Sequence, residues 1–228
     1  IRLGHGGTEM GQGLFIKIAQ VVADVFSVSI DRIELATTTT SEVPNTSATA
    51  ASSGSDINGM AAYDAAIKIK KRMAKVASQH FEAPIKEIYF EDELIKCRNK
   101  TISFADLAQL TWSKRVSLSS TGFYKTPKIH WDQNTMQGNP FFYFTWGASI
   151  SEVVIDAFTG ESNILSANIV QDCGTSLNPS IDIGQIEGAF IQGLGWLTCE
   201  ELYWNDKGRL MTICLLYTSP SPRDTMSS

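Results

Sequence analysis

Apolar side chains recur at helical spacing in two stretches of the chain. The first stretch follows a glycine-rich segment and has apolar residues three or four positions apart: Leu14, Ile18, Val21, Val22 and Val25. The second has them at intervals of four: Ala61, Ala65, Ile69 and Met73. Because one face of a helix repeats every three or four residues, both stretches predict amphipathic helices, the second from about Asp56. Ser53, Ser55 or Asp56 could supply its N-cap.

β-Branched and aromatic runs predict strands around these helices. Segments 1–4 and 33–40 flank the first helix, and a strand–helix–strand order predicts a parallel pair of strands. Further strands are expected at 87–97 as a short hairpin, at 115–124, and at 141–174 as two long strands around "FTGES".

Two more segments complete the pattern of elements. Ser103 and Asp106 resemble a capping box and predict a helix start. Residues 181–202 are predicted to form a helix that contains several glycines, followed by a hairpin at 203–212. The mixture of helices and strands predicts an α/β fold class (α+β mixed).

Charge and composition limit the classes of partner. The net charge of −5 over 228 residues argues against non-specific nucleic-acid binding, which needs a basic face. No apolar run approaches the roughly 18 residues that span a bilayer, so no membrane partner is expected. The cysteines are far apart and form no CxxC pair, as expected for free thiols of a cytoplasmic protein: Cys97, Cys173, Cys199 and Cys214.

The two ends of the chain differ from its interior. Ile1 already lies in a strand-like segment, so we expect a preceding part of the protein. From about residue 213, "LYTSPSPRDTMSS" turns to Ser, Pro and Thr, and it resembles translated sequencing-adapter DNA; a genuine disordered tail is the alternative. We therefore expect one partial domain over 1–212 and a non-native or disordered tail over 213–228.

The segment "GHGGTEMGQG" is the first candidate for chemistry. It fails the dinucleotide pattern GxGxxG, because Glu9 stands where the third glycine should, and it lacks the P-loop Gly-Lys-Ser/Thr. It still puts free amides and the Gln12 carboxamide at a helix N-terminus, which favours an anionic or acceptor-rich ligand. A tight turn that merely requires glycine is the alternative, and the residues alone leave both open.

Two further segments have the same character. The run "NTSATAASSGSD" exposes backbone amides without bulk directly before a helix, which suits either a ligand-facing loop or a linker. The glycines of the last helix permit close packing or close approach of a ligand at some cost in helix stability: Gly184, Gly188, Gly193 and Gly195. No nucleophile motif or metal-ligand spacing occurs, so chemistry here would need a cofactor.

Six segments, in this order and spacing, resemble the xanthine dehydrogenase and aldehyde oxidase family. They are "GGTEMGQG", "VPNTSATAAS", "STGFYKTP", "GNPFFYFTWGASISEVVID", "SLNPSIDIGQIEGAFIQGLGWLTCEEL" and "GRLMT". The resemblance covers about 1–212 and is greatest to the molybdopterin-binding subunit of bacterial xanthine dehydrogenases. It implies that the chain is an internal fragment of the molybdopterin-binding domain.

The resemblance also implies a molybdenum–molybdopterin cofactor and the residues that hold it. Family motifs carried onto this sequence give the expected cofactor-binding residues: Met10, Gly11, Gln12, Ala50, Ala51, Ser52, Ser53 and Gln185. The first motif would bind through amides and the glutamine side chain, and the second would approach the metal and the phosphate side. No residue of the chain is expected to ligate the metal.

The activity implied is hydroxylation of a purine (hypoxanthine or xanthine) with oxygen from water. Electrons would pass to 2Fe-2S clusters and FAD in other subunits or regions, within a homo- or hetero-oligomer. The family's catalytic glutamate stands in a Gly-Glu-Pro motif that this sequence lacks, and Gly160-Glu161-Ser162 lies in a predicted turn, so we expect the chain alone to be inactive. An aldehyde or N-heterocycle hydroxylase, or a non-catalytic molybdopterin-binding or assembly protein, remains an alternative.

Overall fold

The computed structural model describes residues 1–43 and 46–212, and the chain consists of two compact units with their boundary between Asn178 and Pro179. Helices and strands are mixed throughout, which confirms the predicted fold class. The helices are α1 (Leu14–Phe26), η1 (Ile30–Arg32), α2 (Gly54–Phe81), η2 (Ile85–Glu87), α3 (Phe104–Ser113) and α4 (Pro179–Thr198), where η marks a short 3-10 helix. The strands are β1 (Arg2–Leu3), β2 (Glu34–Leu35), β3 (Tyr89–Glu91), β4 (Leu94–Cys97), β5 (Lys100–Ser103), β6 (His130–Asp132), β7 (Gln137–Asn139), β8 (Gly147–Ile155) and β9 (Ser162–Gln171).

The first unit begins with the predicted strand–helix–strand arrangement. β1 and β2 pair in parallel, with Leu3 opposite Leu35, and α1 connects them. The strand expected over 33–40 has only two paired residues, because β1 ends at Leu3 and leaves the following residues without a partner strand.

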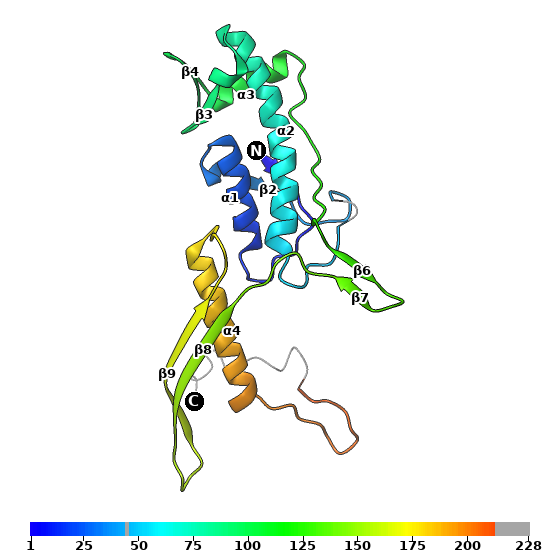
Figure 1. Cartoon of the computed structure of the whole chain (residues 1–228), viewed down its shortest axis with the longest axis vertical. Coiled ribbons are helices and arrows are strands. Elements are labelled where there is room, and N and C mark those ends of the chain that lie inside the picture. The colour runs from blue at the N-terminus through cyan, green and yellow to red at the C-terminus, as the bar shows by residue number, and fades with distance from the viewer. Residues whose placement is uncertain (44–45, 213–228) are drawn as a thin grey trace. The chain divides into compact units, whose positions relative to one another are not determined.

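The core of the first unit lies between α1 and α2, which run side by side in Figure 1. α2 buries Met73 as predicted, but Ala61 and Ala65 are only partly buried, and Ala62 and Ala66 face the core instead. The prediction was wrong by one position because a spacing of four drifts around a helix of 3.6 residues per turn. The buried positions of α2 lie along one face of the helix, mostly three, four or seven residues apart: Gly59, Ala62, Ala66, Met73, Val76, Ala77 and Phe81.

A three-stranded antiparallel sheet, β3–β4–β5, leads into α3. The hairpin predicted at 87–97 is confirmed, and β5 extends it by one strand. The predicted helix start is also confirmed, because the Ser103 hydroxyl accepts the Asp106 amide at 3.0 Å and donates to its carboxylate at 2.6 Å. The sheet and α3 add Ile95 and Leu107 to the core.

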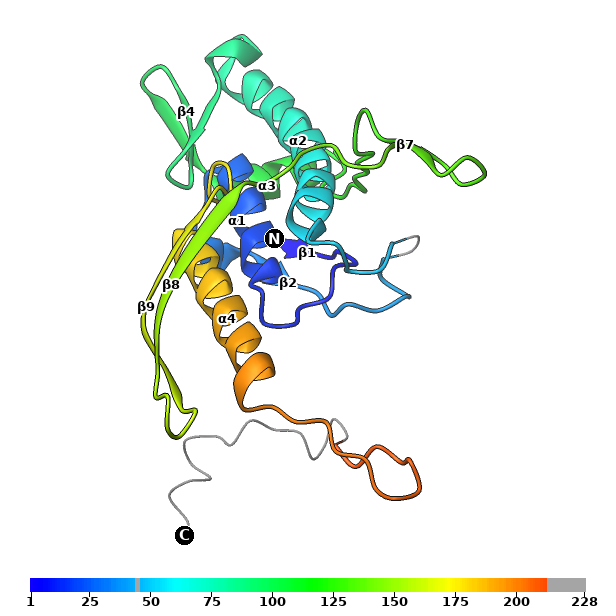
Figure 2. The same ribbon diagram turned by 60° about the horizontal axis from the view of Figure 1, so that its bottom comes forward.

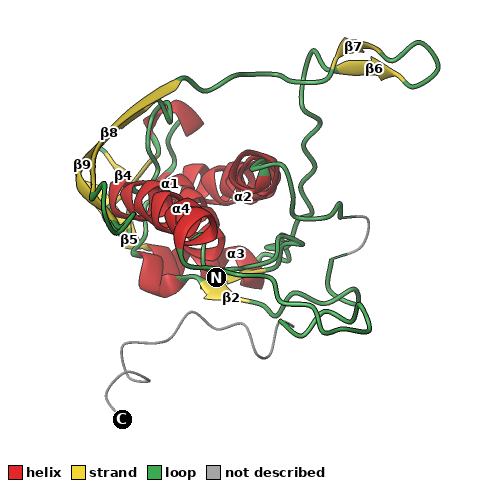
Figure 3. Cartoon of the chain, turned by 90° about the horizontal axis from the view of Figure 1, so that it is seen from below, coloured by secondary structure: helices red, strands yellow, loops and turns green. Residues whose placement is uncertain are grey.

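Residues 115–124, which we call the strap, were predicted to be a strand and are not one. Figure 3 draws the chain between α3 and β6 as loop, and Figure 1 shows it running alongside α2. Its carbonyls are bound by a helix side chain in place of a neighbouring strand: Arg72 donates to Ser117 and Ser119 at 2.9 and 3.0 Å. The β-branched and polar residues of the strap therefore form an extended segment that is bonded to a helix. Their pattern does not distinguish such a segment from a strand that pairs with another strand.

The long hairpin predicted over 141–174 is confirmed as β8 and β9, which pair antiparallel from Gly147 opposite Gln171 to Ile155 opposite Ser162 (Figure 2). The aromatic run 141–146 precedes the strand and is not part of it. A short hairpin, β6–β7, was not predicted.

The second unit begins with α4, which confirms the helix predicted over 181–202 with slightly earlier bounds. The hairpin predicted at 203–212 is a turn closed by one antiparallel bridge between Trp204 and Leu210. The tail predicted over 213–228 lies outside the described residues. Across the described ranges, no helix is both long and apolar enough to cross a membrane.

Candidate functional site

The turn from Thr8 to Gly13 carries the first predicted site residues and is closed by the Gln12 side chain. Gln12 Nε2 donates to the Thr8 carbonyl at 2.8 Å, and the Met10 amide donates to Gln12 Oε1 at 2.6 Å. Gly11 and Gly13 have φ of 96° and 74°, the left-handed region that glycine enters without steric cost. A Cβ on Gly11 would meet no atom within 4 Å, so there is space beside the turn at this point.

Three amides at and just before the start of α1 are not free, which corrects the expectation from the sequence. Glu9 Oε1 accepts the amides of Gly11 and Gly13 at 2.9 and 3.0 Å, and Oε2 accepts that of Phe15 at 2.9 Å. Although burial acts to raise the pKa of Glu9, the surrounding amide hydrogen bonds outweigh it and lower that pKa. A carboxylate of the chain itself therefore occupies the position expected for an anionic ligand.

His5 contacts residues on either side of the same turn. It is buried, accepts the Gly7 amide on Nδ1 at 3.1 Å, and packs edge-on against Phe15 with ring centroids 4.9 Å apart. Burial lowers the pKa of His5, and the nearby Glu9 carboxylate opposes that effect only in part. A neutral ring that accepts on Nδ1 carries its proton on Nε2.

The second predicted group, Ala50 to Ser53, forms the loop before α2. Ala51 and Ser52 have positive φ of 58° and 54°, which is uncommon outside glycine and exposes their backbone in a compact bend. Ser53 is the N-cap of α2, as predicted among three candidates, but its hydroxyl donates to the Ala50 carbonyl at 3.2 Å and accepts no helix amide. This loop therefore ends at a helix N-terminus without a side-chain cap.

The structure brings these two segments together. The Thr8 amide donates to Thr49 Oγ1 at 2.8 Å, which ties the turn before α1 to the loop before α2. A Cβ on Gly54 would lie 3.3 Å from Leu14, so the first residues of both helices also pack closely.

One buried acceptor beside this loop lacks a donor. Asp56, in the first turn of α2, has its Oδ2 bound by the Tyr143 hydroxyl at 3.1 Å, whereas its Oδ1 is buried with no partner among the described residues. Burial, and then the Asp56 charge, raise the pKa of Tyr143. An orphaned buried acceptor costs free energy, and a ligand with N–H donors would relieve that cost.

Gln185, the last predicted site residue, lies on α4 in the second unit. No residue of α4 is buried, and a Cβ on Gly184, Gly188 or Gly193 would meet nothing within 4 Å. Glycines with so much space are not explained by close packing within the described chain. The expected convergence of Gln185 with Gln12 stays a prediction.

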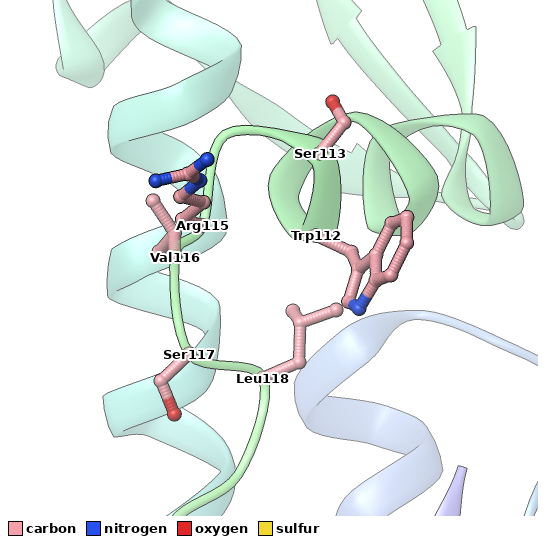
Figure 4. Close-up of a pocket in the computed structure, with 6 residues that line it drawn as sticks. All are labelled: Trp112, Ser113, Arg115, Val116, Ser117 and Leu118. Carbon is pink, nitrogen blue, oxygen red and sulfur yellow. The ribbon is translucent and has the colours of Figure 1, made fainter.

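Other candidate chemistry lies away from these segments. Glu161 lies in the turn between β8 and β9, as predicted. Over 1–43 and 46–212 no three His, Cys, Asp or Glu side chains gather as metal ligands, and Cys97, Cys173 and Cys199 form no disulfide, whereas Cys214 lies outside these ranges. Figure 4 shows an open hollow at the end of α3, which shares no residue with the predicted site; it is lined by Trp112, Ser113, Arg115, Val116, Ser117 and Leu118.

Sequence reasoning missed Glu9 and Asp56 as residues that shape the site. Glu9 was used only to reject a dinucleotide motif, although an acidic residue shortly before a helix is itself a capping signal. Asp56 was considered only as a cap. No pattern in the sequence indicates that one of its oxygens is left without a donor, because that depends on packing.

Comparison with known proteins gives consistent matches. A family model described as molybdopterin cofactor-binding domain matches residues 1–225. Xanthine dehydrogenase/oxidase of Felis catus is 46% identical over 212 residues, which are 93% of this chain and 14% of that protein. Xanthine dehydrogenase of Oryza sativa subsp. japonica is 46% identical over 202 residues, 89% of this chain and 13% of that protein.

Solved structures agree in fold. Quinoline 2-oxidoreductase from Pseudomonas putida 86 has a TM-score of 0.74 at 25% identity, over 98% of this chain and 28% of that one. Reconstituted CO dehydrogenase from Oligotropha carboxidovorans has a TM-score of 0.71 at 20% identity, over 92% of this chain and 26% of that one. The chain spans about one seventh of the length of the curated relatives from Felis catus and Oryza sativa.

Proposed function

Because the chain belongs to the molybdopterin cofactor-binding domain family, within the xanthine dehydrogenase/oxidase group, we propose that it holds a molybdenum–molybdopterin cofactor with the two loops before α1 and α2 and with α4. The observation that carries this proposal is the hydrogen bond between Thr8 and Thr49, which keeps the two loops side by side. The proposed contact residues are Met10, Gly11, Gln12, Ala50, Ala51, Ser52, Ser53 and Gln185.

The residues present suit the group chemically. A pterin edge carries several N–H donors and acceptors, and the Gln12 carboxamide and the Asp56 carboxylate offer partners for both kinds. The small residues before α2 let a phosphate approach a helix N-terminus that has no side-chain cap. When bound, the group supplies oxygen transfer and accepts two electrons, whereas the protein binds and orients it.

For the whole protein we propose hydroxylation of a purine, as the names of the curated relatives suggest. The base would be a glutamate of a Gly-Glu-Pro motif that this sequence does not contain, so the chain alone would be inactive. Electrons would leave to 2Fe-2S clusters and FAD in other regions or subunits. Large apolar side chains are exposed on β8 and α4, among them Ile150, Trp196 and Leu197, which suits contact with further protein surface.

A second candidate substrate class is an N-heterocycle or aldehyde. The observation in its favour is the structural match to a quinoline 2-oxidoreductase over nearly the whole chain. Steady-state assays of the full-length protein with hypoxanthine, xanthine, quinoline and an aromatic aldehyde separate these substrate classes. A non-catalytic molybdopterin-binding protein would show cofactor content without turnover of any of them.

The binding proposal is tested by cofactor content. Gln12→Ala and Gln185→Ala are expected to lower molybdenum and pterin per protein, measured by elemental analysis and by fluorescence of the oxidised pterin. Gln109→Ala on the exposed side of α3 is the matched control and should keep both at the wild-type level. Unchanged molybdenum and pterin in both site variants would refute the proposal.

A further inference from the structure

The protein's own Glu9 binds amides at and just before the start of α1. Both oxygens of Glu9 are engaged, with three amides of the turn and first helical residues at 2.9–3.0 Å. No other residue of the turn bears charge, and the first turn of α1 contains no acidic side chain. The positive end of the helix dipole is thus matched by one internal carboxylate.

This arrangement bears on what the turn can bind. A phosphate placed at the same amides would have to displace Glu9 and would then face its negative charge at short range. The amides that Glu9 holds are therefore not available to an external anion. What the turn can present to a ligand is neutral, namely the space beside Gly11, where a Cβ would meet no atom within 4 Å, and the second donor and second acceptor positions of the Gln12 carboxamide.

Glu9 also fixes the shape of that neutral surface. The amides that it binds belong to Gly11 and Gly13, which flank Gln12 on both sides, and both glycines hold left-handed φ. Without these bonds the turn would be free to adopt other conformations, and the side chain of Gln12 would lose its fixed position.

We propose that Glu9 is a positioning residue that replaces an external anion at the N-terminus of α1 and holds Gln12 toward the cofactor, so that the cofactor's phosphate is not received at this helix. The role of Gln12 rests on the proposed function, whereas the occupation of the helix start by Glu9 does not. The two parts are therefore tested separately.

The first experiment tests the occupation and needs no cofactor. The amide NMR signals of Gly11, Gly13 and Phe15 in the full chain are followed during titration with inorganic phosphate. In wild type they should stay unchanged, and in Glu9→Ala they should shift with phosphate and exchange with solvent at least tenfold faster. Glu91→Ala, an exposed residue of β3 paired with Lys96, is the control and should behave as wild type. Shifts in wild-type protein with phosphate would overturn the proposal, whatever the fate of the variants.

The second experiment tests the positioning in cofactor-loaded full-length protein. Glu9→Gln keeps the length of the side chain and one acceptor oxygen, and it should retain more molybdenum and pterin than Glu9→Ala. Loss of cofactor in Gln12→Ala together with wild-type content in Glu9→Ala would overturn the positioning role and leave the proposed function intact. Wild-type content in Gln12→Ala, Gln185→Ala and Glu9→Ala together would refute the proposed function, while the phosphate titration still decides the occupation of the helix.

Discussion

Replacing Gly122 by alanine should destabilise the first unit by forcing the strap away from α2. A Cβ at this position would lie 1.8 Å from the Ala61 carbonyl oxygen and 2.8 Å from the Ala65 amide nitrogen. Both atoms belong to the backbone of a long helix, so neither can move without breaking helical hydrogen bonds. The strap itself must therefore shift.

The magnitude follows from what that shift disrupts. Besides the two Arg72 bonds, Lys68 donates to the Thr121 carbonyl at 3.3 Å, and the Phe123 amide donates to Asp64 at 3.2 Å. Hydrogen bonds of this kind contribute about 0.5–1.5 kcal/mol each, toward the lower end for exposed groups, and overpacking costs about 1–3 kcal/mol. We expect the free energy of unfolding to fall by about 2–3 kcal/mol, a loss of about 6 °C in Tm for a unit of this size.

The assay is urea unfolding followed by circular dichroism, with Gly59→Ala as the matched control. Gly59 lies on the same helix, and a Cβ there would meet Val21 at an ordinary 3.8 Å. Because alanine favours the helix by up to about 1 kcal/mol over glycine, the control should be neutral or stabilising. A change in stability below about 0.5 kcal/mol for Gly122→Ala would show that the strap does not pack on α2 as described.

Two further predictions concern protonation and capping. Burial lowers the pKa of His5 in the folded protein, so below pH 6.5 the unfolded chain binds the extra proton and the free energy of unfolding falls as the pH falls, by at most about 1.4 kcal/mol per pH unit. In urea unfolding between pH 7 and 5, His5→Asn should flatten this pH dependence. An unchanged slope would contradict the role given to His5. Ser103→Ala should remove the N-cap of α3 and lower the free energy of unfolding by about 1 kcal/mol. Ser113→Ala, at the other end of the same helix, should lower it by less, and equal losses in the two variants would contradict the capping role.

The elements that sequence predicted well are those whose signal is local. The α1 periodicity, the Ser103 cap and the long hairpin around "FTGES" each depend on residues that contact their own neighbours in the chain. The prediction of a strand for the strap was wrong for the opposite reason. Its extended conformation is set by Arg72, more than forty positions earlier, and no pattern within 115–124 reports that partner.

The candidate site shows the same division. The resemblance of motifs to a known family was confirmed by the comparisons, but the motifs do not determine which amides of a glycine-rich turn remain available. Availability depends on whether a nearby side chain folds back on the turn. Glu9 does so, whereas the serine before α2 bonds to its own loop.

The two helix starts therefore differ in where their acidic residue lies relative to the first helical residue. Before α1 the chain places a carboxylate five residues ahead of the first helical residue, and that distance lets it reach the amides of the turn and of the first turn of the helix. Before α2, from Thr49 to Ser53, the chain has only methyl and hydroxyl groups, and the carboxylate of this helix start belongs to Asp56 within the first helical turn. Glu9 folds back on the amides of its turn, whereas Asp56 accepts the Tyr143 hydroxyl on Oδ2 and has no donor on Oδ1. An acidic residue shortly before a helix is therefore a sequence signal that the chain itself occupies amides of the turn that precedes the helix.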